Sequence, residues 1–217
     1  LLGENAGVIS GNALVVDYVL TITVSIAAAG DALFSFLPLH WQPVKLAAEV
    51  LIILSLTTLN IRGVRESVLT LTPIFIVFLI THVWLSGYGI AAHATQLPAT
   101  VHTISSGYHY GLSALGVGGM MVWFVRAYSL GGGTYTGLEA GSNGLPIMRA
   151  PRVHTGRRTM FYMAASLAFT AAGLLVCYLL WHVHLEPGKT ANASLLERMT
   201  VGLPGGATFL VVTLVSE

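Results

Sequence analysis

Apolar runs of about twenty residues recur along the chain and constrain its fold more than any other feature. A helical residue rises about 1.5 Å, so a helix of this length crosses the ~30 Å hydrocarbon core of a bilayer. Only 9% of the 217 residues are charged and 54% are hydrophobic, whereas a soluble domain carries about 25% charged residues. The sequence therefore predicts an all-α, polytopic integral membrane protein.

We expect a single transmembrane domain over residues 1–217, with six spans. They cover about 13–36, 44–60, 68–92, 112–147, 159–183 and 205–217, the fourth broken at 130–135 and the sixth truncated. Because the first residue is Leu1 and the last apolar run stops at Glu217, we interpret the chain as a fragment of a longer protein.

Arginines between the predicted spans indicate how the spans are oriented. They follow the second and fourth spans, at Arg62, Arg65, Arg149, Arg152, Arg157 and Arg158, while the alternate connections are poorer in positive charge. Cytoplasmic loops carry the excess of Lys and Arg, so the first span is expected to run outward and the fourth inward. The simplest role for the later cluster is a topology anchor that contacts lipid phosphates.

Several classes of function find no support in the residues. The net charge of +1 gives no electrostatic reason to expect a nucleic acid partner. Cys177 is the single cysteine, so there is neither a disulfide framework nor a cysteine metal site. No nucleophile, base or metal-ligand set stands in a recognisable motif, and an enzyme is not expected.

Polar residues inside the apolar runs are the candidates for function, because an ionisable group at membrane depth is costly. Asp17, Thr21 and Ser25 are spaced i, i+4 and i+8 and share one helix face. That stripe either faces a cavity, or serves only helix packing and bonds to backbone carbonyls. Glu49 follows Lys45 by four residues, and a simple ion pair explains both.

Arg126 lies about fifteen residues into the predicted fourth span. A guanidinium at that depth either pairs with an intramembrane carboxylate, for which Asp17 is a candidate, or faces a water-filled cavity. A charge relay and a structural ion pair remain open for Arg126.

The stretch "GGGTYTGLEAGSNGLP", residues 131–146, interrupts the fourth span. Glycines loosen a helix, and a broken helix survives in lipid only inside protein or beside a cavity. Thr136 and Glu139 match the capping box that starts a helix, and Asn143 shares their face. The alternatives are a capped kink and a ligand site in which Glu139 also carries a coupling proton.

Three ordered motifs resemble the amino acid–polyamine–organocation (APC) superfamily of permeases. They are "DYVLTITVSI" in the first span, "LNIRGVRES" after the second and "TGLEAGSNGLP" in the fourth. The resemblance extends over nearly the whole chain. The branch that the chain resembles most contains potassium/proton symporters, many of whose members are labelled amino acid permeases.

The resemblance implies a leucine-transporter-type inverted-repeat fold, of which this fragment covers about helices three to eight. It also implies a potassium site at Thr21, Ser25, Thr136 and Glu139. Proton coupling through Glu139 is a separate hypothesis, which rests on the position of this carboxylate beside a broken helix. Gly131, Gly132, Gly133 and Asn143 complete the expected substrate site. The break is more glycine-rich than the family pattern, which leaves room for a substrate larger than a bare ion.

The expected function is proton-coupled uptake of a small cation, with potassium slightly favoured over the alternative, an amino acid. A remote alternative is a membrane sensor or structural subunit that does not transport. No organic cofactor is expected, only bound potassium and coupled protons. The expected partners are the lipid bilayer and the small solute, a homodimer is left open, and a prokaryotic inner membrane is implied by the resemblance.

Overall fold

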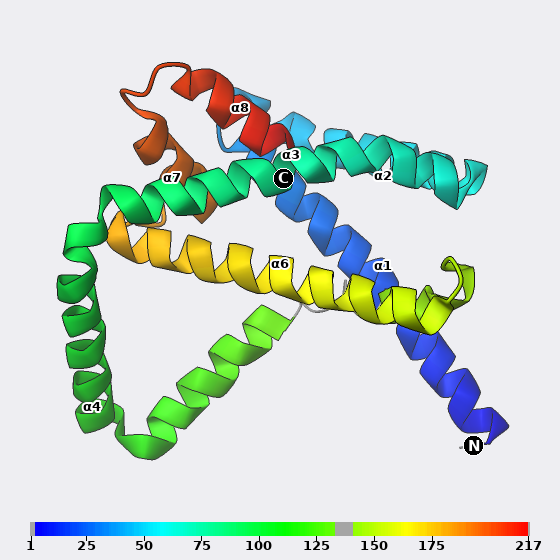
Figure 1. The fold of residues 1–217 in the computed structure, drawn as a ribbon, viewed down its shortest axis with the longest axis horizontal. Helices are drawn as coiled ribbons and strands as arrows, with labels where there is room; N and C mark the ends of the chain where they lie inside the picture. Colours follow the sequence, from blue (N-terminus) through cyan, green and yellow to red (C-terminus); the bar gives the residue numbers. More distant parts are fainter. Residues whose placement is uncertain (1–2, 133–140, 217) are drawn as a thin grey trace. The chain divides into compact units, whose positions relative to one another are not determined.

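A computed structural model describes residues 3–132 and 141–216, except for the side chains of residues 64–66. Throughout this described part the regular structure is helical, as the sequence predicts. The chain divides into two compact units, residues 1–81 with 184–217, and residues 82–183. Each unit is described by itself, and Figure 1 gives the element labels.

The first unit is built on a hairpin of two long helices. It contains α1 (Glu4–Phe34), η1 (Leu39–Val44), α2 (Lys45–Arg62), the first part of α3 (Val64–Ala92), α7 (Ala191–Thr200) and α8 (Gly206–Ser216). A Cβ atom on Gly30 would collide with the Glu49 carboxylate, so this glycine permits α2 to approach the end of α1 closely. Thr190 caps α7, because its side chain accepts a hydrogen bond from Ala193 N at 3.1 Å.

The second unit holds the rest of α3, η2 (Ala94–Gln96), α4 (Leu97–Gly131), η4 (Leu145–Ile147) and α6 (Arg152–Leu180). Trp181 Nε1, just after α6, donates to Gly89 O at 3.0 Å. Gly173, two turns earlier on α6, lies against Ser86, one turn earlier on α3. The two helices therefore run in the same direction, which agrees with the orientation predicted from the arginines.

A bend divides α4 near its middle, and it is visible in Figure 1. Gly116 interrupts the helix with φ 67° and ψ 176°, a backbone conformation that glycine adopts readily. The helix begins at Leu97, whereas the predicted fourth span begins near Leu112. Pro98 stands in the first turn of α4, where it has no hydrogen bond to lose, and the polar residues that follow it are helical as well.

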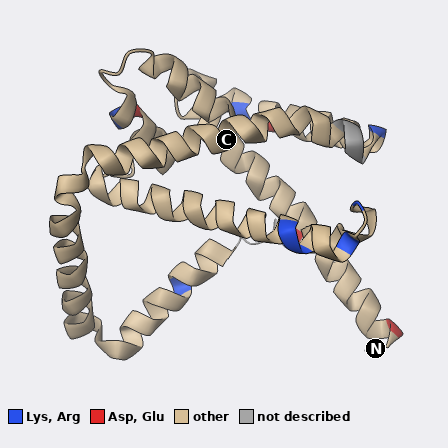
Figure 2. Ribbon diagram, viewed as in Figure 1, with Lys and Arg blue, Asp and Glu red and all other residues tan. Residues whose placement is uncertain are grey.

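Among the described helices, four are long and apolar enough to cross a membrane, over Glu4–Phe34, Leu39–Arg62, Ser67–Ala92 and Arg152–Leu180. Two regions predicted as spans are not among them. The helix α8 has only 11 residues, and the glycines and Arg126 of α4 dilute its apolar run. In the most apolar 18-residue stretch of each of these four helices, at most 22% is buried within the structure. Most of their apolar side chains are therefore exposed. Charged residues are sparse along the helices (Figure 2), and an apolar surface of this kind fits a multi-pass membrane protein.

Candidate functional site

One face of α1 carries the polar stripe in the first unit. Asp17, Thr21 and Ser25 all lie inside this continuous helix, so the predicted i, i+4, i+8 spacing places them in one row. Asp17 and Thr21 are half-buried, whereas Ser25 is exposed.

The hydroxyls of this row differ from their neighbours in hydrogen bonding. Thr23 lies off the row, and its Oγ1 donates to Val19 O at 2.7 Å, as threonines inside helices commonly do. Within the described residues, the hydroxyls of Thr21 and Ser25 make no such bond. Two hydroxyl oxygens on one helix face are thus available to a ligand or to another helix.

The helix that carries the glycines ends where the sequence places the break. Gly131 is the last residue of α4, and the N–H of Gly132 donates to Ser129 O. The described chain resumes with helical residues at 141–143. A Cβ atom on Gly141 would lie 3.4 Å from Met163 Sδ, so this returning segment packs on α6.

The structure describes only some of the predicted site residues around the break. Gly131 and Asn143 are exposed and Gly132 is half-buried. Gly133, Thr136 and Glu139 lie outside the described residues, and the roles assigned to them stay predictions.

Arg126 lies on the exposed surface of α4 in the second unit. It lines an open groove of about 550 Å³ along the helix, together with Met121, Val122, Val125, Ser129 and Leu130. Asp17 belongs to the first unit. The pairing of Arg126 with Asp17 therefore stays a prediction.

The interpretation of Glu49 as an ion-pair partner is confirmed. Lys45 Nζ lies 3.7 Å from Glu49 Oε1, one helical turn away, and it also pairs with Asp31 at the end of α1. Lys45 thus ties the two helices of the hairpin together, while Glu49 Oε1 has an ion pair but no hydrogen-bond partner among the described atoms.

Two features of the second unit escaped the sequence interpretation. One is the bend at Gly116, for which the glycines at 116, 118 and 119 were the available signal. The other is a buried polar patch on α3, where His82 and Ser86 are each 1% exposed. Ser86 Oγ has no hydrogen-bond partner among the described atoms. An ionisable His82 inside an apolar run was the signal for this patch.

The structure thus places the candidate residues on two separate units. The hydroxyl row belongs to α1, and the end of α4 with Asn143 belongs to the second unit. The fold and these elements define a class, a multi-pass α-helical membrane protein with polar groups on its long helices.

Comparison with known proteins narrows that class. No family model matches the chain. The chain is 33% identical over 177 residues to the potassium transporter KimA of Bacillus subtilis (strain 168). The aligned region covers 81% of this chain but 28% of that protein, so the chain spans less than a third of the relative's length. The protein is therefore a membrane protein distantly related to a bacterial potassium transporter.

Proposed function

We propose that the chain is the central part of a proton-coupled potassium transporter of the APC superfamily, with a leucine-transporter-type fold, in a prokaryotic inner membrane. The observation that carries this proposal is the 33% identity to a protein named as a potassium transporter. The four candidate spans support it, because secondary transporters are built from such helices.

The chemistry of the proposed site suits a cation. Potassium is bound by oxygens, and hydroxyl, carbonyl and carboxylate groups supply them. Thr21 and Ser25 offer two hydroxyls on one face of α1, and their freedom from hydrogen bonds in the described residues supports this role. In the proposal, Thr136 and Glu139 add further oxygens from beyond the end of α4.

Proton coupling is assigned to Glu139 in this proposal. A carboxyl group beside a broken helix can take up and release a proton during a transport cycle. Protonation would weaken potassium binding by removing a negative charge. Rocking of one helical repeat against the other would then expose the site to each side in turn.

Uptake by single variants of the full-length protein in proteoliposomes tests the site. Thr21→Val and Ser25→Ala should each raise the KM for potassium about tenfold, the effect of removing one hydroxyl contact to a charged ligand. The matched control is Thr23→Val, which lies on the same helix but off the row and should stay within about twofold. Equal effects at Thr21, Ser25 and Thr23 would contradict the assignment of the face.

The coupling role of Glu139 is tested separately. Glu139→Gln should abolish potassium accumulation driven by a proton gradient while exchange of potassium for a rubidium tracer continues. Glu4→Gln, which removes an exposed carboxylate at the start of α1, is the control. Unchanged proton-driven uptake in Glu139→Gln would refute the coupling.

An amino acid permease is the second candidate. The end of α4 at Gly131 favours it, because a restarted helix near that end would offer backbone N–H groups to a substrate carboxylate. This candidate predicts that an amino acid, rather than potassium, binds at the site and is transported.

A further inference from the structure

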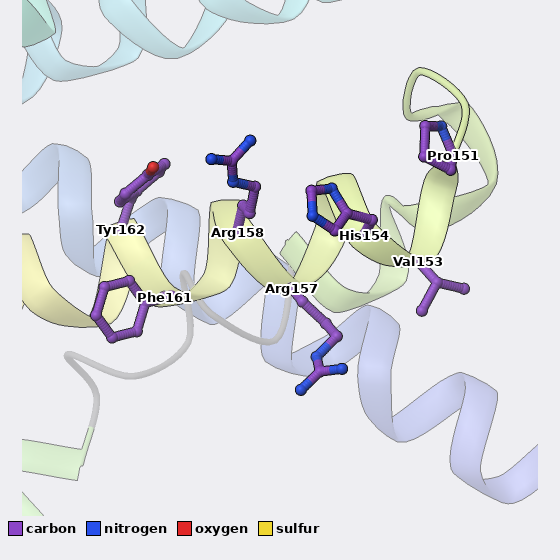
Figure 3. Close-up of a pocket in the computed structure, with 7 residues that line it drawn as sticks. All are labelled: Pro151, Val153, His154, Arg157, Arg158, Phe161 and Tyr162. Atoms are coloured by element: carbon purple, nitrogen blue, oxygen red, sulfur yellow. The ribbon is translucent and has the colours of Figure 1, made fainter.

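A shallow basic groove of about 570 Å³ lies at the start of α6, in the second unit. Its lining combines two arginines and a histidine with two aromatic rings. The residues are Pro151, Val153, His154, Arg157, Arg158, Phe161 and Tyr162 (Figure 3). The proposed transport function makes no use of this groove.

Two rows of side chains form the walls of the groove, each with one residue per helical turn. His154, Arg158 and Tyr162 make one row at spacings of four, and Val153, Arg157 and Phe161 make the other. Figure 3 shows Arg158 and Tyr162 pointing to one side of the helix, and Arg157 and Phe161 to the other. The two arginines, at adjacent positions, therefore flank the groove from opposite sides, and each ring lies about 6 Å further along the helix than the arginine of its row.

The opposite face of this helical segment is already covered. Gly156 is buried, and a Cβ atom there would collide with the Leu145 side chain of η4. The side chains of the groove therefore stand on the face that η4 leaves open, where Arg157, Arg158, Phe161 and Tyr162 are exposed.

The two arginines are also free to bind an anion. In the described part of the chain neither guanidinium forms an ion pair with a carboxylate. An arginine fork matches the geometry of a phosphate, and each of these two forks stands at an edge of the groove where it can bind one.

We propose that this groove binds an anionic glycerophospholipid, with its phosphate at the end flanked by Arg157 and Arg158 and its glycerol and upper acyl chains along Phe161 and Tyr162. Charge complementarity selects an anion, and the order of the groups along the helix selects a lipid. The rings follow the arginines along α6, which is one of the candidate membrane spans. Aromatic rings characteristically occupy this level between headgroups and hydrocarbon.

A lipid explains the apolar walls better than a free phosphate does. Val153 is 72% exposed and Phe161 67% exposed, and both line the groove. A soluble phosphate would leave these side chains in contact with water, whereas acyl chains and glycerol cover them. The arginines thus form a defined lipid site rather than a diffuse positive surface.

The test measures lipid binding to the delipidated full-length protein in detergent by native mass spectrometry. The probes are phosphatidylglycerol, which is anionic, and phosphatidylcholine, which is not. Arg157→Gln/Arg158→Gln is compared with Arg149→Gln/Arg152→Gln, which removes the same charge from exposed positions nearby that do not line the groove. Single substitutions at Arg157 and Arg158 keep the test open if the double variant fails to fold.

We expect the unaltered protein to bind phosphatidylglycerol at least about tenfold more tightly than phosphatidylcholine. Each single groove substitution should weaken phosphatidylglycerol binding about fivefold and the double one about thirtyfold, as expected for one or two arginines at a membrane surface. The control double variant should stay within about twofold. Equal losses in both double variants, or unchanged binding in the groove variants, would overturn the proposal. Protection from thermal unfolding by inorganic phosphate alone, to the same extent as by phosphatidylglycerol, would also overturn it.

Discussion

Substitution of Gly173 by Ala should weaken the contact between α3 and α6 in the second unit. A Cβ atom at position 173 would lie 2.5 Å from Ser86 Oγ and 2.8 Å from Ser86 Cβ. Carbon atoms in contact are separated by about 3.5–4.0 Å, so the helices must move apart by about 1 Å. Because Ser86 Cβ is fixed to the backbone of α3, rotation of the Ser86 side chain cannot relieve this clash.

The expected loss of stability is about 1–3 kcal/mol, the usual effect of one extra methyl group in a packed interface. Ser86→Gly in the same chain should recover part of it, since it removes both clashing atoms. The recovery is limited by the cost of about 1 kcal/mol for glycine inside a helix. Ser86 Oγ makes no hydrogen bond among the described atoms, so its removal leaves no described partner unsatisfied.

The thiol of Cys177 reports on this contact. Cys177 is fully buried, and its Sγ lies 3.9 Å from Ser86 O. The experiment uses full-length protein in which any other cysteine has been replaced. A loss of stability of about 2 kcal/mol should let a maleimide label Cys177 about thirtyfold faster in Gly173→Ala than in the protein that keeps Gly173. Gly87→Ala is the control, because a Cβ atom there meets nothing within 4 Å. Equal labelling rates in the two variants would refute the reasoning.

Substitutions at three further positions test contacts of the first unit by thermal unfolding. Lys45→Met removes the ion-pair partner of Asp31 and of Glu49, whose side chain is 14% exposed. We expect a loss of stability of about 1–3 kcal/mol. An unchanged melting temperature would contradict the role of Lys45. Thr190→Ala removes the N-cap of α7 and should cost about 1 kcal/mol, whereas Thr190→Ser should retain most of the stability. The hydrogen bond from Lys189 Nζ to Glu197 Oε2, at 2.6 Å, raises the pKa of Lys189 above its ordinary value of 10.5. The contribution of this hydrogen bond to stability is complete below the ordinary pKa and is lost as the pH rises through the raised pKa. The melting temperature of the unaltered protein should therefore fall over that pH range. Lys189→Met should not show this fall.

Features that depend on local periodicity could be predicted from the sequence. The predicted second span, 44–60, corresponds to the helix Lys45–Arg62, because the apolar run itself sets the helix. The Lys45–Glu49 pair followed from the i, i+4 geometry of one helix. The row of Asp17, Thr21 and Ser25 followed in the same way.

Features that depend on tertiary structure could not be predicted. The pairing of Lys45 with Asp31 requires the turn that brings the end of α1 to the start of α2. The start of α4 at Leu97 was missed because its first residues are polar and carry no apolar run. The groove on α6 was not predicted, because the arginines that line it belong to a cluster that the sequence analysis explained as a topology anchor. The spacing of four that joins each arginine to an aromatic ring becomes informative once α6 is known to begin at Arg152.

Tracer uptake by the full-length protein in proteoliposomes tests the central claim most directly. An inward proton gradient is imposed, and uptake of labelled potassium is followed with and without a mixture of unlabelled amino acids. The proposed function predicts saturable potassium uptake that depends on the proton gradient and is unaffected by the amino acids. Absence of potassium uptake, with proton-driven accumulation of one amino acid instead, would contradict it.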